Sequence, residues 1–104
     1  MTTIAQTIIY QIIEQDLNAL PAWGVNEVVD LHNGVQFDIR TPLYPEGVKV
    51  KIILNWMDTY DIEVIKVTGT KAETLKTAND VYFDMLIEVL DKLIEEDKKT
   101  IILF

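Results

Sequence analysis

Cysteine and serine are both absent from the 104-residue chain, and the one histidine is His32. Without cysteine, disulfides, thiolate zinc sites and cysteine nucleophiles are excluded. Without serine, the single histidine has no serine hydroxyl to activate, and it falls in a predicted turn beside Asn33-Gly34. The sequence therefore predicts a protein that is not an enzyme and that has no catalytic residue.

Positive charge is also scarce, since nine Lys and Arg stand against seventeen Asp and Glu, a formal net charge of −8. Such a chain should bind neither nucleic acid nor an anionic membrane directly, and it favours a protein partner with a basic surface. No apolar stretch approaches the roughly 20 residues that cross a bilayer, and no basic leader region follows Met1. Together with the lack of cysteine, this predicts a cytoplasmic protein.

Motifs that hold cofactors or metals are missing as well. The four glycines are scattered as single turn residues and do not form a phosphate-binding loop. Asp58 and Asp61 could approach a divalent cation, but no segment has the Asp-x-Asp-x-Asp-Gly order of a calcium loop. We therefore predict no cofactor and no metal site.

What the chain does contain is a strong alternating pattern over Gly47–Val67. Apolar residues occupy every second position from Val48 to Trp56 and again from Tyr60 to Val64, which predicts a hairpin of two strands with one buried face. A three-residue loop, 57–59, pairs apolar residues across the hairpin: Trp56 with Tyr60, Leu54 with Ile62 and Ile52 with Val64. The pattern slips at Lys66, which indicates a bulge near Ile65 or Lys66 or a strand that leaves the core.

A second hairpin is predicted for Glu27–Leu31 and Val35–Ile39. A three-residue loop, His32-Asn33-Gly34, pairs Leu31 with Val35 and Val29 with Phe37, and it puts glycine where a left-handed residue is needed. The segment 41–47 is predicted to be a loop, because its two prolines cannot lie inside a central strand.

Helices are predicted at both ends of this region. Apolar residues recur at helical spacing over Thr2–Leu20, where Thr3 and Gln6 fit a capping box and Pro21 ends the helix. Trp23 should anchor the following connector to the core. The second helix should run from Val81 to about Asp97 with Asn79 as its N-cap. Residues 72–76 could be a strand or a helical turn, and a fifth strand is favoured.

These elements predict a single α+β domain over residues 1–104. Its four- or five-stranded antiparallel sheet should carry the N-terminal and C-terminal helices on one face. The apolar segment Ile101–Phe104 should pack on the core, add to a sheet edge or form an interface, because exposure would favour aggregation.

Acidic residues form the clearest surface pattern. Five of them, spaced four, four, three and four residues apart, should share one face of the C-terminal helix: Asp80, Asp84, Glu88, Asp91 and Glu95. Acids four apart in a helix are about 6 Å apart, close to the spacing of nucleic-acid phosphates. The line therefore predicts a partner-binding surface that mimics a nucleic-acid backbone, although a solvated helix face explains the same spacing.

In size, charge and mixed α+β pattern, the chain resembles small acidic proteins of phages and mobile elements, among them inhibitors of restriction or CRISPR enzymes. The resemblance implies a non-enzymatic binding protein that occupies a basic nucleic-acid-binding surface. The alternative is a structural or assembly protein that forms a homo-oligomer, such as a homodimer, through its apolar C-terminus and a sheet edge.

Overall fold

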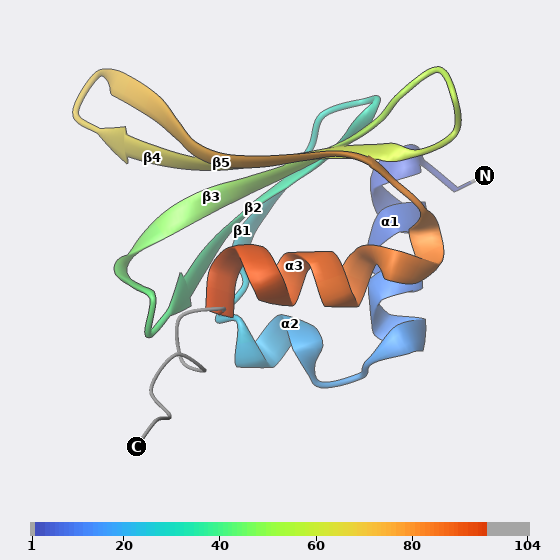
Figure 1. Cartoon of the computed structure of the whole chain (residues 1–104), viewed down its shortest axis with the longest axis horizontal. Helices are drawn as coiled ribbons and strands as arrows, with labels where there is room; N and C mark the ends of the chain where they lie inside the picture. The colour runs from blue at the N-terminus through green and yellow to red at the C-terminus, as the bar shows by residue number, and fades with distance from the viewer. Residues whose placement is uncertain (1, 96–104) are drawn as a thin grey trace.

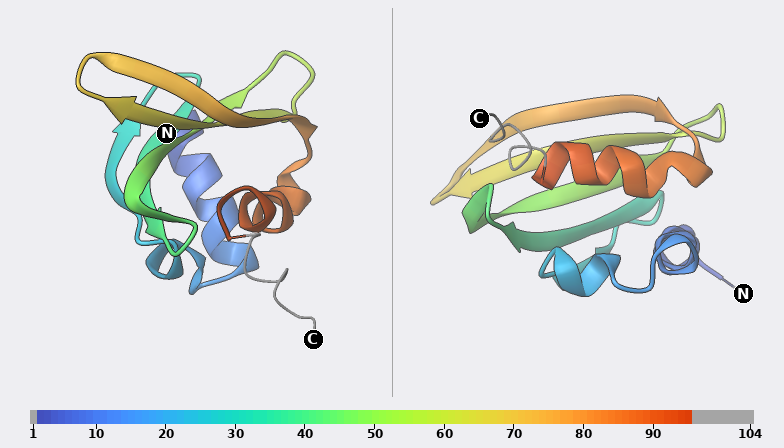
Figure 2. Two further views of the ribbon diagram at one scale, coloured as in Figure 1. Left: turned by 60° about the vertical axis from the view of Figure 1, so that its left-hand side comes forward. Right: turned by 60° about the horizontal axis from the view of Figure 1, so that its bottom comes forward.

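A computed structural model of the chain describes residues 2–95. Its elements in chain order are α1 (Ile4–Gln15), α2 (Ala19–Ala22), β1 (Asn26–Asp30), β2 (Gly34–Thr41), β3 (Tyr44–Leu54), β4 (Tyr60–Thr68), β5 (Lys71–Val81), η1 (Phe83–Met85) and α3 (Leu86–Glu95). The five strands form one antiparallel sheet in the order β1-β2-β3-β4-β5, and the helices lie on one of its faces (Figures 1 and 2). The predicted α+β fold is confirmed.

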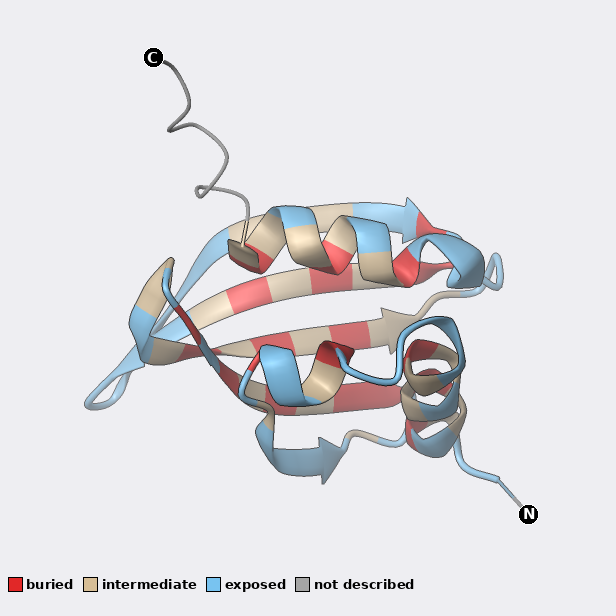
Figure 3. Ribbon diagram, turned by 90° about the horizontal axis from the view of Figure 1, so that it is seen from below, coloured by how far each residue is buried: buried red, intermediate tan, exposed pale blue. Residues whose placement is uncertain are grey.

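The core lies between this face of the sheet and the two longer helices (Figure 3). Ile8 and Ile12 of α1 are fully buried, and α3 contributes Leu86, Leu90 and Ile94 at spacings of four. This spacing turns one apolar stripe of each helix toward the sheet. Along the central parts of β2, β3 and β4 every second residue is buried, as the period of a strand requires: Val35, Phe37, Ile39, Val48, Val50, Ile52, Tyr60, Ile62 and Val64.

The first helix has the predicted capping box, in which Thr3 and Gln6 exchange side-chain and backbone hydrogen bonds. Its predicted end at Leu20 is wrong, because α1 stops at Gln15 and a separate short helix, α2, follows. Pro21 lies in the first turn of α2, where no helical N–H is required, so it does not terminate the helix. Trp23 is buried against the core, as predicted.

The register predicted for the central hairpin is wrong by two residues. Tyr60 pairs with Leu54, and Ile52 pairs with Ile62, so the loop is Asn55–Thr59 and has five residues. A shift of two keeps the same side chains on the buried face, and burial alone therefore could not separate the two registers. Its main consequence is that Trp56, predicted in the core, is 90% exposed on the loop.

The register predicted for the β1–β2 hairpin is wrong by one residue. Asp30 pairs with Val35 and Val29 with Gln36, around a four-residue loop. The left-handed position is His32, with φ 76°, while Gly34 lies against the backbone of β3. All five residues of β1 are exposed. The predicted register assumed that β1 buries one face. Because the strand buries neither face, burial does not determine its register.

The predicted loop over 41–47 is also wrong, since β3 already begins at Tyr44 and pairs there with Thr41. Pro45 is accommodated because the pairing of β3 with β4 starts only at Lys49. Gly47, with φ 89°, lies in the segment of β3 where the pairing with β2 shifts register, which indicates a bulge.

The predicted slip in β4 is confirmed. The pairing with β5 shifts between Val64 and Ile65, and β4 is exposed from Lys66 onward. Val67 is part of this exposed stretch and does not enter the core.

Residues 72–76 form a strand, as favoured, but β5 runs on to Val81. Pairing with Tyr60 and Ile62 of β4 holds Val81 and Ala78 in the sheet, so Asn79 is a strand residue and not an N-cap. The predicted helix start at Val81 is therefore wrong, since η1 intervenes and α3 begins at Leu86. The predicted helix end near Asp97 and the apolar segment Ile101–Phe104 lie outside the described residues.

Candidate functional site

The five acids predicted to bind a partner do not lie on one helix. Asp80 is in β5 with a left-handed backbone, φ 57°, and Asp84 is in η1. Only Glu88, Asp91 and Glu95 belong to α3. The predicted line along one helix face is thus interrupted at its N-terminal half, because spacing by four residues aligns side chains only within a continuous helix.

These acids also differ in exposure. Asp80, Asp84 and Glu88 are exposed, and Glu88 lies 3.9 Å from Lys92 in an i, i+4 pair. Asp91 is half-buried, and its Oδ1 accepts a hydrogen bond of 3.0 Å from Nε1 of the buried Trp23. Asp91 therefore has a structural role in joining α3 to the connector after α2. The carboxylates most accessible to a partner are those of Asp80, Asp84 and Glu88.

The β3–β4 loop, Asn55–Thr59, is held in one conformation by the side chain of Asn55. Its Oδ1 accepts hydrogen bonds from the backbone N–H of Met57 at 2.9 Å and of Thr59 at 3.2 Å. Its Nδ2 donates to Asp61 Oδ1 at 3.1 Å. The Asn55 N–H also donates to the Thr59 carbonyl at 2.8 Å, which closes the loop. Asp58 completes it with a left-handed backbone, φ 64°.

This loop is joined to the end of β5. Asp80 Oδ1 lies 3.5 Å from both Asn55 Nδ2 and Thr59 Oγ1, and the Asp80 N–H donates to Asp61 Oδ1 at 3.2 Å. Both segments therefore lie at one end of the molecule, where the β3–β4 loop and the turn from β5 into α3 are found (Figures 1 and 2). We call residues 55–59 and 80–85 together the loop end.

The loop end exposes more aromatic surface than sequence reasoning anticipated. Trp56 is 90% exposed, Tyr82 60% and Phe83 57%, and Met57 and Met85 are exposed beside them in sequence. The loop end also carries three exposed carboxylates, Asp58, Asp80 and Asp84, and its two segments contain no Lys, Arg or His. A signal for this loop was present in the sequence, because an asparagine before an Asp-Thr pair can bond the backbone of its own turn.

Helix α1 supports the loop end from the side of the core. Gln15 Nε2 donates to the Phe83 carbonyl at 2.7 Å, and the Tyr60 hydroxyl donates to Gln11 Oε1 at 2.7 Å. Burial of Tyr60 raises the pKa of its phenol above the usual 10.0.

Tyr60 should make the fold less stable in alkali. A phenol whose pKa is higher in the folded than in the unfolded state stabilises the fold while it is neutral. That contribution is fully present below pH 10 and is lost as the pH rises through the folded-state pKa. Between about pH 8 and about pH 11, the free energy of unfolding measured in urea should therefore fall more steeply with pH for the wild type than for Tyr60→Phe. Equal falls in the two proteins would contradict this assignment.

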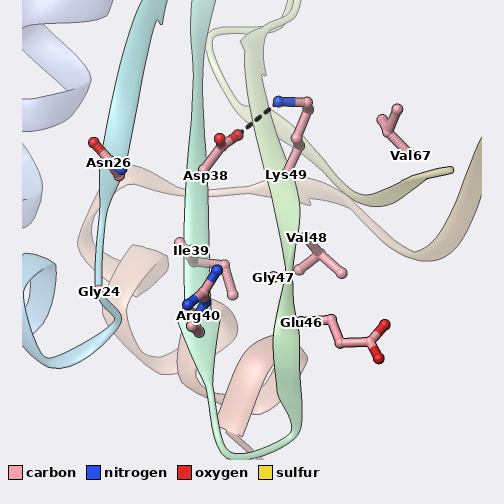
Figure 4. Close-up of a pocket in the computed structure, with 10 residues that line it drawn as sticks. All are labelled: Gly24, Asn26, Asp38, Ile39, Arg40, Glu46, Gly47, Val48, Lys49 and Val67. Carbon is pink, nitrogen blue, oxygen red and sulfur yellow. Dashed lines mark hydrogen bonds and ion pairs between the residues drawn. The ribbon is translucent and has the colours of Figure 1, made fainter. Parts of the chain in front are cut away.

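An open hollow of about 680 Å³ lies on the face of the sheet opposite the helices (Figure 4). Its ionised side chains come from β2 and β3 and balance in charge: Asp38, Arg40, Glu46 and Lys49. Lys49 Nζ is 2.7 Å from Asp38 Oδ1, so this pair is already internally satisfied. The hollow suggests no reaction and no preference for an anion or a cation.

Within residues 2–95, no three His, Asp or Glu side chains are grouped in a way that could hold a metal ion. None of the helices in that range has the length and apolar character needed to cross a membrane. Comparison with profiles of known protein families, with curated proteins and with solved structures found no match.

Proposed function

We propose that this protein is a non-enzymatic binding domain that acts by contact with a basic protein surface. The observation that carries the proposal is the exposure of Asp80, Asp84 and Glu88 on consecutive elements, in a chain with net charge −8. Within this set only Glu88 lies close to a lysine, in a solvent-exposed pair that holds it weakly.

The basic surface that fits such a domain best is the nucleic-acid-binding groove of an enzyme. Such grooves are lined with Lys and Arg, and carboxylates presented at intervals along a rigid fold replace phosphates there. An inhibitor of this kind, like those that phages and mobile elements direct against restriction or CRISPR enzymes, needs no active site of its own. Its binding should be steered by charge and weakened by salt.

The test is capture of a partner from a low-salt lysate of the cells from which the gene comes. The wild type is compared with the triple reversal Asp80→Lys, Asp84→Lys and Glu88→Lys. A matched control reverses three exposed acids elsewhere, Glu27→Lys, Glu46→Lys and Glu73→Lys, and changes the net charge equally. Circular dichroism first establishes that all three proteins are folded.

We expect the wild type and the control to retain a DNA- or RNA-binding protein that the reversal at residues 80, 84 and 88 loses. Raising the salt from about 50 mM to about 500 mM, or adding double-stranded DNA, should release that partner. If both reversals retain the same proteins, the three acids only solvate the surface. Loss from both would show that net charge alone, and no specific surface, drives capture.

A second candidate function is assembly into a homo-oligomer through the sheet edge. All five residues of β1 are exposed, among them Val28 and Val29, and an open edge strand can pair with another chain. This function predicts that the same capture experiment recovers only further copies of the protein, and that salt does not release them.

A further inference from the structure

The loop end combines exposed aromatic side chains with uniformly negative charge. Trp56, Tyr82 and Phe83, on the two segments of the loop end, each expose more than half of their surface. Trp and Tyr are among the residues that contribute most to binding energy in protein interfaces. Two of the acids predicted from the sequence, Asp80 and Asp84, therefore lie in a segment that also exposes Tyr82 and Phe83.

Charge decides what could cover these aromatic side chains. A second copy of the loop end would bring Asp58, Asp80 and Asp84 against their own equivalents, and like charges brought together in an interface cost free energy. An apolar partner without charge would bury the same carboxylates unpaired. A cationic partner avoids both penalties, because its charged groups can lie beside the three carboxylates while its apolar groups cover the rings.

Arginine satisfies the two requirements in one side chain. Its planar guanidinium stacks on an indole face and also binds a carboxylate through two parallel hydrogen bonds, whereas a lysine ammonium acts as a point charge. Trp56 offers an indole with 90% of its surface free, and Asp58 follows it by two residues.

We propose that the loop end binds a segment of the partner protein in which arginine alternates with apolar residues, with the guanidinium stacked on Trp56. This inference rests on the proposed function and specifies the chemistry of the partner. The backbone of the loop is already fixed before binding by the hydrogen bonds of the Asn55 side chain. A preformed loop loses less conformational freedom when the partner docks.

The probe is a set of capped hexapeptides in which Arg alternates with Leu, Lys with Leu, Arg with Ser, or Glu with Leu. The readout is the ¹⁵N–¹H spectrum, where the two tryptophans give two indole signals and Trp56→Phe identifies that of Trp56. Trp23 is buried and serves as the internal reference. Because Trp56 is almost fully exposed, Trp56→Ala should leave the melting temperature unchanged.

The Arg–Leu peptide should move the Trp56 signal and leave that of Trp23 in place. Its Kd should be at least about tenfold lower than those of the Arg–Ser and Glu–Leu peptides, and several-fold lower than that of Lys–Leu. Trp56→Ala should raise the Kd of the Arg–Leu peptide about tenfold or more. No movement of the Trp56 signal at about 5 mM peptide, or equal binding of Glu–Leu, would overturn the inference.

A double variant separates charge from loop structure. Asp58→Asn with Asp84→Asn removes two charges, and asparagine tolerates the left-handed backbone of position 58. It should raise the Kd of the Arg–Leu peptide several-fold and reduce the salt dependence of that Kd. The control, Glu46→Gln with Glu73→Gln, should do neither. Equal effects of the two double variants would also overturn the inference.

Failure of this inference is distinguishable from failure of the proposed function. If a captured partner is lost on reversal of residues 80, 84 and 88 but is retained fully by Trp56→Ala, the acidic surface binds without the aromatic anchor. In that case the proposed function stands and the arginine-stacking contact is wrong. If the Arg–Leu peptide binds through Trp56 but no partner is captured, the chemistry of the loop end stands and the proposed function does not.

Discussion

Replacement of Gly34 by alanine should lower the free energy of unfolding by about 3 kcal/mol or more, a large effect for one methyl group. An alanine Cβ at this position would lie 2.1 Å from the Ile52 carbonyl oxygen and 2.8 Å from Ile53 Cα. These are backbone atoms of the central strand, which cannot swing aside as a flexible side chain does. Either β2 separates from β3 locally, or the paired residues Gly34 and Ile53 shift in register.

Urea unfolding followed by circular dichroism measures this change, and Gly69→Ala is its control. Gly69 has a positive φ, 61°, and a Cβ there would meet no atom within 4 Å. The control should cost only about 1 kcal/mol, the strain of a left-handed alanine. Similar losses for the two variants would show that β2 and β3 do not approach as closely at Gly34 as described.

Trp23→Ala should destabilise the fold by about 3–5 kcal/mol, the range for removal of a large buried aromatic side chain. Trp23 is 1% exposed, and its loss would leave a cavity between the connector and the core. It would also remove the indole N–H that binds Asp91 Oδ1 at 3.0 Å. Thermal and urea unfolding measure the effect, and Trp56→Ala, at a residue that is 90% exposed, should be close to neutral.

Two milder variants separate packing from hydrogen bonding at this site. Trp23→Phe keeps much of the packed volume but loses the donor, and it should cost about 1.5–3 kcal/mol, as for hydrogen bonds to charged groups. Asp91→Asn keeps an oxygen acceptor, and it should cost less than Asp91→Ala. If Asp91→Ala were neutral, the contact with Trp23 would not stabilise the docking of α3.

The sequence was sufficient to predict the strands whose apolar alternation matches the face that they bury in the sheet. Alternation in β3 and β4 correctly placed Val50, Ile52 and Ile62 in the core, because a strand must turn alternate side chains to one side. The same alternation is unchanged by a slip of two residues, so it could not fix the loop. The Asn55 side chain fixes it, through hydrogen bonds that apolar patterning does not describe.

The candidate site was only partly predictable for a related reason. Asn79 and Asp80 have the composition of a helix start, but pairing of Ala78 and Val81 with β4 keeps this segment in β5, an override of local preference by tertiary contacts. The helical spacing of the acids therefore does not align the side chains of Asp80 and Asp84, which precede α3. Trp56 was predicted to be buried because it continues the apolar alternation of β3 and was expected to pair with Tyr60, and its exposure follows from the loop register.

The order of strands in the sheet has a consequence for the rate of folding. Each strand pairs with the strand that follows it in the chain, so the sheet can assemble hairpin by hairpin with short loop closures. The long closures are those that fasten the helical layer: Gln15 to Phe83 and Trp23 to Asp91 each join residues 68 positions apart. Since distant contacts are entropically slow to form, docking of α3 beside α1 should be the late event, on a meander already in place.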